Sequence, residues 1–148
     1  MKVAVIGHRQ VKISNELNEM IYTLTEALIK KGADSFCFSF LGAFSNACYK
    51  AATALKQKYP INRVYYYSHE NALAQLSKDR FDVEVIANKS CCYKSINTFM
   101  IDDCDVLLTL YDEHYVSFRS QTGKSGTYFA VKYANKRDKR IVNIIDFI

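Results

Sequence analysis

Long apolar runs are missing from this sequence, and their absence excludes a class of protein. No run approaches the roughly 20 apolar residues that a membrane-spanning helix needs, although 49% of all residues are hydrophobic. The first residues, M-K-V-A-V-I-G-H-R, hold only a short apolar run before a polar turn. Such a run is too short for a secretory signal peptide. We therefore expect a cytoplasmic protein with no membrane partner.

The sequence also lacks the cysteine and histidine spacings that bind metals. Its five cysteines are Cys37, Cys48, Cys91, Cys92 and Cys104; they contain no C-x-x-C and stand mostly within apolar segments. In a reducing compartment such cysteines are usually small core residues. A redox role stays open for Cys91 and Cys92, which lie in a polar stretch. We expect no structural zinc, no other metal and no cofactor.

Repeats, low-complexity tracts and linkers are absent as well, so we expect one domain over residues 1–148. The net charge of +5 is spread along the chain, except for a basic cluster at Lys136–Arg140 where a helix is expected to end. Basic residues stabilise a helix C-terminus, so this cluster does not by itself indicate nucleic-acid binding. A basic surface equally attracts a small anionic ligand. Nucleic acid stays open as the less favoured partner.

Apolar runs alternate with amphipathic segments along the chain. The apolar runs predict strands over residues 2–7, 34–42, 61–67, 105–111 and 140–145, with a short strand or an extended loop at 82–86. The amphipathic segments predict helices over residues 14–32, 43–59, 95–104 and from Gly123 or Gly126 to about Asn135, with a short helix near 71–76. Strands that alternate with helices form a parallel sheet covered on both faces. The predicted fold is a Rossmann-like three-layer α/β sandwich with a mainly parallel central sheet.

Ligands of open α/β sheets bind beyond the carboxyl ends of the strands. The turns at these ends read Gly7-His8-Arg9, Leu41 to Asn46, Ser68-His69-Glu70, and Tyr111 to His114 with a long loop to Gly126. Two of them bring a glycine to the start of a helix, where bare backbone N–H groups and the helix dipole favour an anion. These turns are the predicted ligand-binding segments.

The stretch G-K-S-G-T, residues 123–127, looks like part of a phosphate-binding P-loop but does not fulfil that pattern. A P-loop has four residues between its first two glycines, and the position of the first glycine is Phe118 here. A phenylalanine does not provide the tight turn that wraps backbone amides around a phosphate. The small residues Gly123, Ser125, Gly126 and Thr127 still suit one phosphate or a ribose hydroxyl. The alternative is a loop capped by Ser125 or Thr127.

Four segments of the chain resemble the SLOG superfamily of Rossmann-like proteins, which includes the LONELY-GUY phosphoribohydrolases and the DNA-processing protein DprA. The segments are V-A-V-I-G-H-R, F-L-G-A-F-S-N-A, L-K-Q-K-Y-P-I-N-R-V and the stretch from Ser125 to Ile144. Together they extend over nearly the whole chain apart from residues 68–89. The sequence is most similar to small bacterial and prophage members that begin with a strand and G-H-R.

Members of this superfamily hold a nucleotide or nucleotide-like ligand between two glycine-containing loops. The resemblance implies a ligand-binding role for three sets of residues here, with Arg9 and Lys124 neutralising phosphate charge. Gly7, His8 and Arg9 would line one side and Gly42 and Ser45 the floor, and the phosphate would lie against Gly123, Lys124, Ser125, Gly126 and Thr127.

The chain departs from the patterns of its relatives at three places. The phosphoribohydrolases use P-G-G-x-G-T-x-x-E, whose glutamate helps to cleave the N-glycosidic bond, and Ala130 stands at that position here. Ser45 stands where the small G-H-R relatives have an acidic residue, and Lys94 to Asn97 stands where they have an arginine–asparagine pair. These departures favour binding over catalysis of that type.

A catalytic carboxylate at another position is the alternative. Asp112 and Glu113 follow the carboxyl end of a predicted strand, which is the rim where chemistry is expected. His69 and Glu70 form a second possible acid–base pair. His8 follows the glycine at the end of the first strand and suits either catalysis or a contact with a ligand oxygen. Loop carboxylates and histidines are, however, most often simply solvated.

The sequence therefore predicts a protein that binds a nucleotide or a nucleotide-derived small molecule, as a sensor, a sequestering protein or a partner module. Tyr67, at the end of its predicted strand, is a candidate for stacking on the base, although core packing is the commoner role of such a residue. Two alternatives stay open: an N-glycosidase or phosphoribohydrolase acting on a nucleoside monophosphate, and a DNA-associated protein similar to DprA. A homodimer also stays open.

Overall fold

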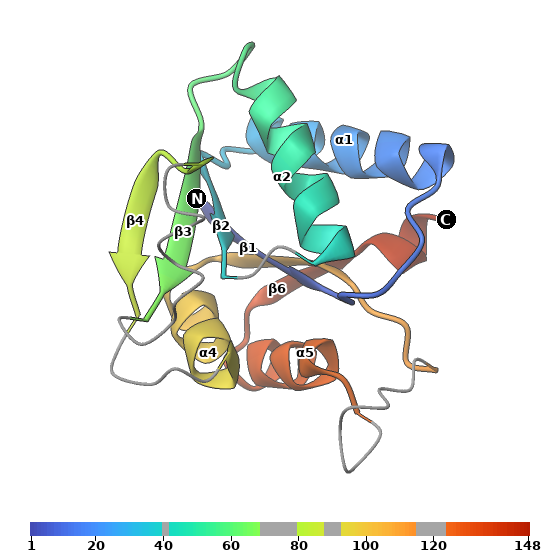
Figure 1. Ribbon diagram of the computed structural model, residues 1–148, viewed down its shortest axis with the longest axis vertical. Helices are drawn as coiled ribbons and strands as arrows, with labels where there is room; N and C mark the ends of the chain where they lie inside the picture. Colours follow the sequence, from blue (N-terminus) through green and yellow to red (C-terminus); the bar gives the residue numbers. More distant parts are fainter. Residues whose placement is uncertain (40–41, 69–79, 88–92, 115–123) are drawn as a thin grey trace.

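The chain folds around a six-stranded, all-parallel sheet (Figure 1). The computed structural model describes residues 1–39, 42–68, 80–87, 93–114 and 124–148. The strands are β1 (Lys2–Gly7), β2 (Ser35–Phe38), β3 (Asn62–Tyr67), β4 (Val83–Ile86), β5 (Val106–Leu110) and β6 (Arg140–Asn143). The helices are α1 (Asn15–Lys30), α2 (Ala43–Leu55), α4 (Tyr93–Asp103), α5 (Gly126–Lys136) and the 3-10 turn η2 (Ile144–Phe147). This alternation confirms the predicted α/β class.

The order of the strands across the sheet is β4-β3-β2-β1-β5-β6. After β1 the chain builds the sheet outward through β2, β3 and β4. It then crosses to the other side of β1 for β5 and β6. This reversal places the topological switch point of the sheet between β1 and β5.

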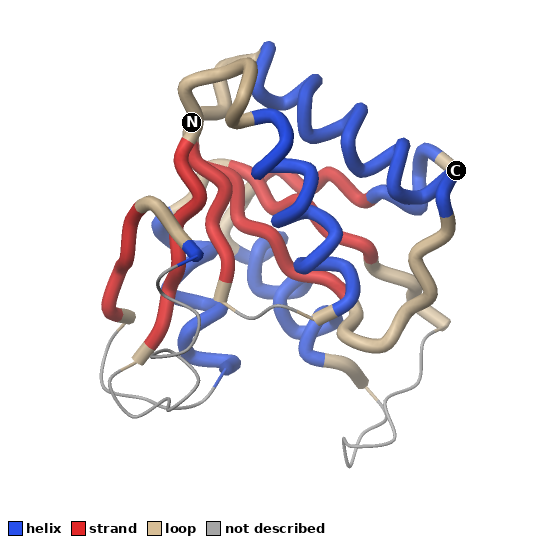
Figure 2. Tube along the Cα trace, turned by 45° about the horizontal axis from the view of Figure 1, so that its top comes forward, coloured by secondary structure: helices blue, strands red, loops and turns tan. Residues whose placement is uncertain are grey.

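Two helical layers cover the sheet. Helices α1 and α2 lie on one face, and α4 and α5 lie on the other (Figure 1; Figure 2). Along β1, Val3 and Val5 belong to the core shared with α1 and α2, whereas Ala4 and Ile6 belong to the core shared with α4 and α5. Strands buried on both faces need a continuous apolar run, and the sequence has one. The predicted three-layer sandwich is confirmed.

The ends of α1 follow the signals in the sequence. Ser14 caps the helix, because its Oγ accepts the N–H of Leu17 at 3.1 Å. The chain leaves the helix through Gly32, whose φ of +110° is a conformation that glycine adopts readily. None of the helices in the described ranges is both long enough and apolar enough to cross a bilayer.

Two predicted elements end earlier than the sequence pattern indicates. The helix predicted over 43–59 ends at Leu55, because the N–H groups of Lys58 and Tyr59 both donate to the Leu55 carbonyl and turn the chain toward β3. The strand predicted over 140–145 ends at Asn143. The side chain of Asn143 accepts the N–H of Ile145, and this bond starts η2.

The remaining differences concern β2, β4 and one helix. The strand predicted over 34–42 is paired only over Ser35–Phe38, since the chain then turns toward α2. The segment at 82–86, for which a strand and a loop were both considered, forms the edge strand β4. The short helix predicted near 71–76 lies outside the described residues.

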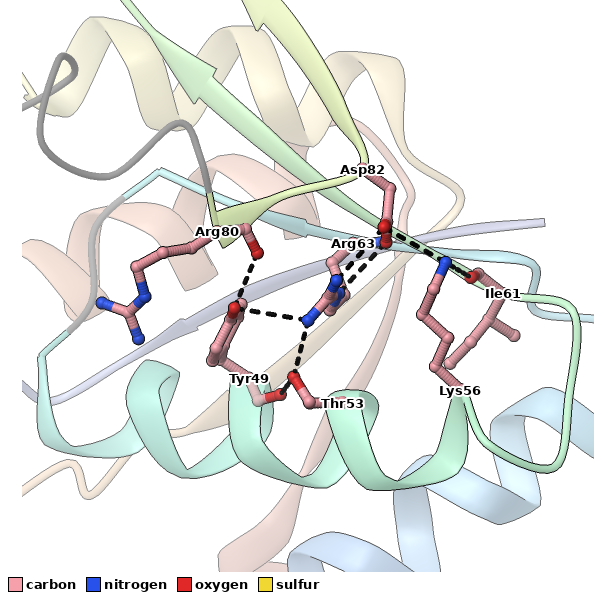
Figure 3. Close-up of polar contacts among 7 residues, drawn as sticks. All are labelled: Tyr49, Thr53, Lys56, Ile61, Arg63, Arg80 and Asp82. Carbon is pink, nitrogen blue, oxygen red and sulfur yellow. Dashed lines mark hydrogen bonds and ion pairs between the residues drawn. The ribbon is translucent and has the colours of Figure 1, made fainter.

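A network centred on Arg63 ties the β3–β4 edge of the sheet to α2 (Figure 3). The Arg63 guanidinium donates to both carboxylate oxygens of Asp82, at 3.0 and 3.1 Å, and to Thr53 Oγ1 at 3.0 Å. Lys56 adds a second ion pair to Asp82 at 3.1 Å. The hydroxyl of Tyr49 donates to the Arg80 carbonyl at 2.6 Å. The hydrogen bonds that Asp82 accepts from Arg63 hold the pKa of its carboxyl group well below its usual range.

Replacing Arg63 by methionine should lower the free energy of unfolding by about 1–3 kcal/mol at pH 7, because Asp82 loses its bidentate ion pair with the guanidinium. The folded-state pKa of Asp82 lies below its unfolded value of about 3.9. The stabilisation is therefore present above about pH 4 and is lost as the pH falls toward the folded pKa. Urea titrations at pH 7 and pH 3 should show a smaller difference from wild type at pH 3.

The matched control is Lys50→Met, which removes an exposed lysine of the same helix α2. It should leave the unfolding free energy nearly unchanged at both pH values. An Arg63→Met variant that loses the same stability at pH 7 and at pH 3 would contradict the role assigned to the Asp82 ion pair.

Candidate functional site at the β1–β5 switch point

The carboxyl ends of β1 and β5 lie side by side, with Gly7 opposite Leu110. Beyond this point the two chain segments separate, since β1 leads to α1 and β5 leads toward α5 (Figure 1). In open α/β sheets this is the position where ligands bind. The predicted residues Gly7, His8 and Asp112 all lie there.

A hydrogen bond joins the two strand ends. The backbone N–H of Asp112 donates to Nε2 of His8 at 3.0 Å, and the His8 side chain is buried, with 3% of the residue exposed. A nitrogen that accepts an N–H carries no proton, so His8 is neutral with its proton on Nδ1. Burial lowers the pKa of His8 below its ordinary value. The Nε2 lone pair that a catalytic base would use is thus engaged by the backbone of Asp112.

The predicted glycines Gly7 and Gly42 lie where two parts of the protein approach closely. A Cβ at Gly7 would lie 2.2 Å from the ring of Phe44, and a Cβ at Gly42 would lie 2.8 Å from Cα of Arg9. The N–H of Ala43 donates to the Arg9 carbonyl at 2.9 Å. Packing within the protein is therefore a sufficient reason for both glycines, and the turn after β1 already binds the start of α2. The predicted residue Ser45 is buried within the first turn of that helix.

The start of α5 is more open than the start of α2. Ser125 caps the helix by accepting the N–H of Tyr128 at 3.1 Å, so the capping role considered for it is present. Gly126 is exposed, and a Cβ placed on it would meet no described residue within 4 Å. The first turn has no acidic residue. The N–H groups of this turn and the helix dipole suit an anion. Gly123 lies outside the described residues.

Thr109 brings a buried hydroxyl to the same place. It lies on β5 and is 0% exposed, and its Oγ1 has no hydrogen-bond partner among the described residues. Leu107 belongs to the buried cluster that contains Ala130 and Ala134 of α5. Side chains alternate along a strand, so Thr109 faces the same layer as Leu107, one step closer to the edge where α5 begins. Thr127, in the first turn of α5, is also buried.

Lysines and aromatic rings cover the neighbouring surface of α4 and α5. Lys124 and Lys132 place their ammonium groups 5.1 and 5.3 Å from the centre of the Tyr128 ring. Lys94 lies 4.6 Å from the centre of the Phe129 ring. These cation–π contacts hold positive charge around the start of α5.

The predicted carboxylates lie on the rim of the candidate site rather than inside the site. Asp112 Oδ1 accepts the N–H of His114 at 2.9 Å, and Glu113 lies 3.6 Å from the His114 ring, with side chains 77% and 87% exposed. His69 and Glu70 lie outside the described residues. Among the described residues, no three His, Cys, Asp or Glu side chains gather as a metal site.

Tyr67 packs inside the protein. Its ring stacks on Tyr65 with centroids 5.5 Å apart, and its hydroxyl donates to Glu84 at 3.3 Å. Only 9% of the residue is exposed. Its face toward Tyr65 is thus already occupied by another ring, in line with the commoner role considered for it.

Sequence reasoning missed three polar side chains on the α4–α5 face of the sheet, which are Ser39 at the end of β2, Thr109 on β5 and Asn97 on α4. A fourth, Ser68 at the end of β3, lies in one of the predicted turns. The available signal was a single polar residue inside or next to an apolar run, as in F-S-F and V-L-L-T-L. Such interruptions are weak evidence until the strand order shows that they share a face.

No protein-family model matches this chain, and no curated protein matches it. The resemblance to the SLOG superfamily therefore stays a prediction that rests on the four sequence segments.

The burial of the His8 ring makes stability depend on pH. Because the folded-state pKa of His8 lies below its unfolded value of about 6.5, the unfolded chain binds the proton more readily. Stability should therefore fall as the pH drops below about 6.5. Tyr111 and Asp112 are titratable residues next to the ring in the described part of the chain. His8→Gln, whose side chain does not titrate, should reduce this dependence, as measured by urea unfolding between pH 7.5 and pH 5.

His114→Gln is the control, since His114 is exposed on the same rim. It should leave the pH dependence of the wild type in place. If His8→Gln shows the same loss of stability between pH 7.5 and pH 5 as the wild type, the buried neutral state of His8 is wrong.

Proposed function

We propose that this protein binds a nucleotide or a nucleotide-derived small molecule at the β1–β5 switch point, with its phosphate at the start of α5. The observation that carries the proposal is the buried hydroxyl of Thr109, which has no partner among the described residues and faces the layer of α5. A buried hydroxyl without a partner is costly, and a phosphate oxygen would satisfy it. The open first turn of α5 supplies N–H donors beside it.

Charge supports an anionic ligand. No acidic residue lies in the first turn of α4 or α5, and Lys94 and Lys124 lie near these two helix starts. Arg9, on the turn after β1, adds a further positive charge at the carboxyl edge of the sheet. A phosphate therefore meets a helix dipole and several cations without a competing carboxylate in either first turn.

Binding without turnover fits these residues better than hydrolysis. Ala130 stands where the phosphoribohydrolases carry their glutamate, and Asp112 and Glu113 lie on the rim. The hydrolase alternative predicts release of free base from a nucleoside monophosphate, abolished by Asp112→Asn or Glu113→Gln. The DNA alternative predicts an affinity that falls steeply with salt. Membership of the SLOG superfamily, a bacterial or phage origin, a cytoplasmic location and a homodimer are proposals that rest on the sequence.

Thr109→Val tests the proposal directly, because valine has nearly the shape of threonine without the hydroxyl. The free protein should keep its stability or gain up to about 1 kcal/mol, since a buried group without a partner disappears. A thermal-shift panel of AMP, IMP, GMP, NAD, ADP-ribose and cyclic ADP-ribose is the measurement. A ligand at about a hundred times its Kd raises the free energy of unfolding of the wild type by roughly 2.7 kcal/mol and its melting temperature by several degrees. Thr109→Val should lose much of that shift.

Thr98→Val on α4 is the control, since the Thr98 hydroxyl donates to the Ser95 carbonyl of its own helix. It should keep the ligand-induced shift. A flat panel with wild type, or an unchanged shift in Thr109→Val, would remove the support for this site.

A negative charge placed at the start of α5 should change the stability of the free protein and its affinity for a phosphate in opposite directions. Gly126→Glu should stabilise the free protein by about 0.5–1 kcal/mol, because an acidic residue suits a helix N-terminus and replaces a glycine. The same carboxylate should repel a phosphate and abolish the ligand-induced shift. Gly126→Gln, of equal size without the charge, should keep more of that shift than Gly126→Glu. If both variants bind the ligand as wild type does, the phosphate does not lie at α5.

A further inference from the structure

A second group of polar side chains lies on the same face of the sheet, over β2 and β3. Ser39 follows β2 and is buried. Its hydroxyl donates to Oδ1 of Asn97, on α4. This bond fixes the orientation of the Asn97 amide, with its oxygen occupied and its NH2 group left as a donor. No described residue accepts a hydrogen bond from that NH2 group.

Ser68 adds a hydroxyl beside this group. It follows β3, is only 1% exposed, and has no hydrogen-bond partner for Oγ among the described residues. Val64 and Tyr66 belong to the core beneath α4, so alternation along the strand directs Ser68 to the same face. Asn97 and Ser68 therefore offer hydrogen bonds that nothing described in the protein uses.

The sheet sets the distance between this group and Thr109. Val5 lies opposite Phe38 of β2, and Ile6 lies opposite Thr109 of β5. Ile6 is therefore the residue between Ser39 and Thr109, and all three face the α4–α5 layer. Two strand spacings, or roughly 10 Å, separate Ser39 from Thr109, and Ser68, after β3, lies a third spacing away, at roughly 14 Å across the sheet. A nucleoside monophosphate with a hydrogen bond at each end, its phosphate at one and the edge of its base at the other, reaches over such a distance.

We propose, resting on the function proposed above, that the ligand is a 6-oxopurine nucleoside 5′-monophosphate whose base edge is read by Asn97 and Ser68. A 6-oxopurine presents two acceptors, O6 and N7, on this edge, whereas adenine presents an N6 amino donor beside N7. The Asn97 NH2 group donates to O6, and the Ser68 hydroxyl donates to N7. The adenine amino group would instead face the Asn97 NH2 group, donor against donor.

Calorimetric titration of the full chain with IMP, GMP, AMP, inosine and inorganic phosphate tests this assignment. IMP or GMP should bind at least about tenfold more tightly than AMP, since a site built to donate rejects a donor. Inosine should bind more weakly than IMP because it lacks the phosphate. Ser68→Ala should weaken IMP binding.

Asn97→Asp replaces the NH2 donor by an oxygen of the same size. It should lose at least about tenfold in affinity for IMP and shift the preference toward AMP. Ser39→Ala removes the hydrogen bond that orients the Asn97 amide and should therefore reduce the ratio of IMP affinity to AMP affinity. This variant tests the assignment even if Asn97→Asp does not fold. Thr98→Val, on the next residue of α4, should leave the preference of the wild type unchanged.

Two outcomes would overturn the assignment and are distinguishable from a failure of the proposed function. If AMP binds wild type as tightly as IMP, or if Asn97→Asp and Ser39→Ala both keep the wild-type preference, the base edge is not read here. The phosphate site at α5 would then still stand. If none of IMP, GMP and AMP binds wild type, this assignment fails, and the proposed function fails with it only if NAD, ADP-ribose and cyclic ADP-ribose also give no thermal shift.

Discussion

The parallel pairing of β1 with β5 is the contact on which the rest of the structure depends. It connects the first strand to a strand more than a hundred residues later, and it sets Gly7 opposite Leu110. The bond from the Asp112 N–H to His8 extends the same pairing beyond the strands. This contact creates the switch point and directs the chain after β5 toward α5. It therefore defines the place where the proposed ligand would meet a helix start.

Two helix starts reach this edge of the sheet with different surroundings. The start of α2 is closed, because the Arg9 carbonyl accepts its first N–H and Phe44 fills the space next to Gly7. At the start of α5 no described residue lies within 4 Å of a Cβ placed on Gly126, and the buried hydroxyl of Thr109 faces the layer that contains α5. The difference explains why a glycine turn alone is an incomplete indication of a ligand site. One such turn here is accounted for by internal packing, and the other leaves a polar group that a ligand would satisfy.

The sequence was sufficient for the fold class, because continuous apolar runs such as K-V-A-V-I-G and amphipathic segments alternate clearly. The positions of Gly7, His8 and Asp112 at strand ends followed from the same pattern. The role of Thr109 could not be predicted, since nothing local in V-L-L-T-L shows which strands flank it. The bond between Ser39 and Asn97 joins residues far apart in the chain. Long-range pairing, rather than local propensity, determines which polar residues share a face.

A crystal structure of the protein with a bound nucleoside monophosphate would test the central claim most directly. The phosphate should lie within hydrogen-bond distance of the N–H groups of Gly126 and Thr127, with one of its oxygens accepting from Thr109. A phosphate bound instead at the start of α2, next to Gly42, would contradict the proposed site. It would mean that the hydrogen bond from the Ala43 N–H to the Arg9 carbonyl breaks, so that the start of α2 separates from the turn after β1 and admits the ligand.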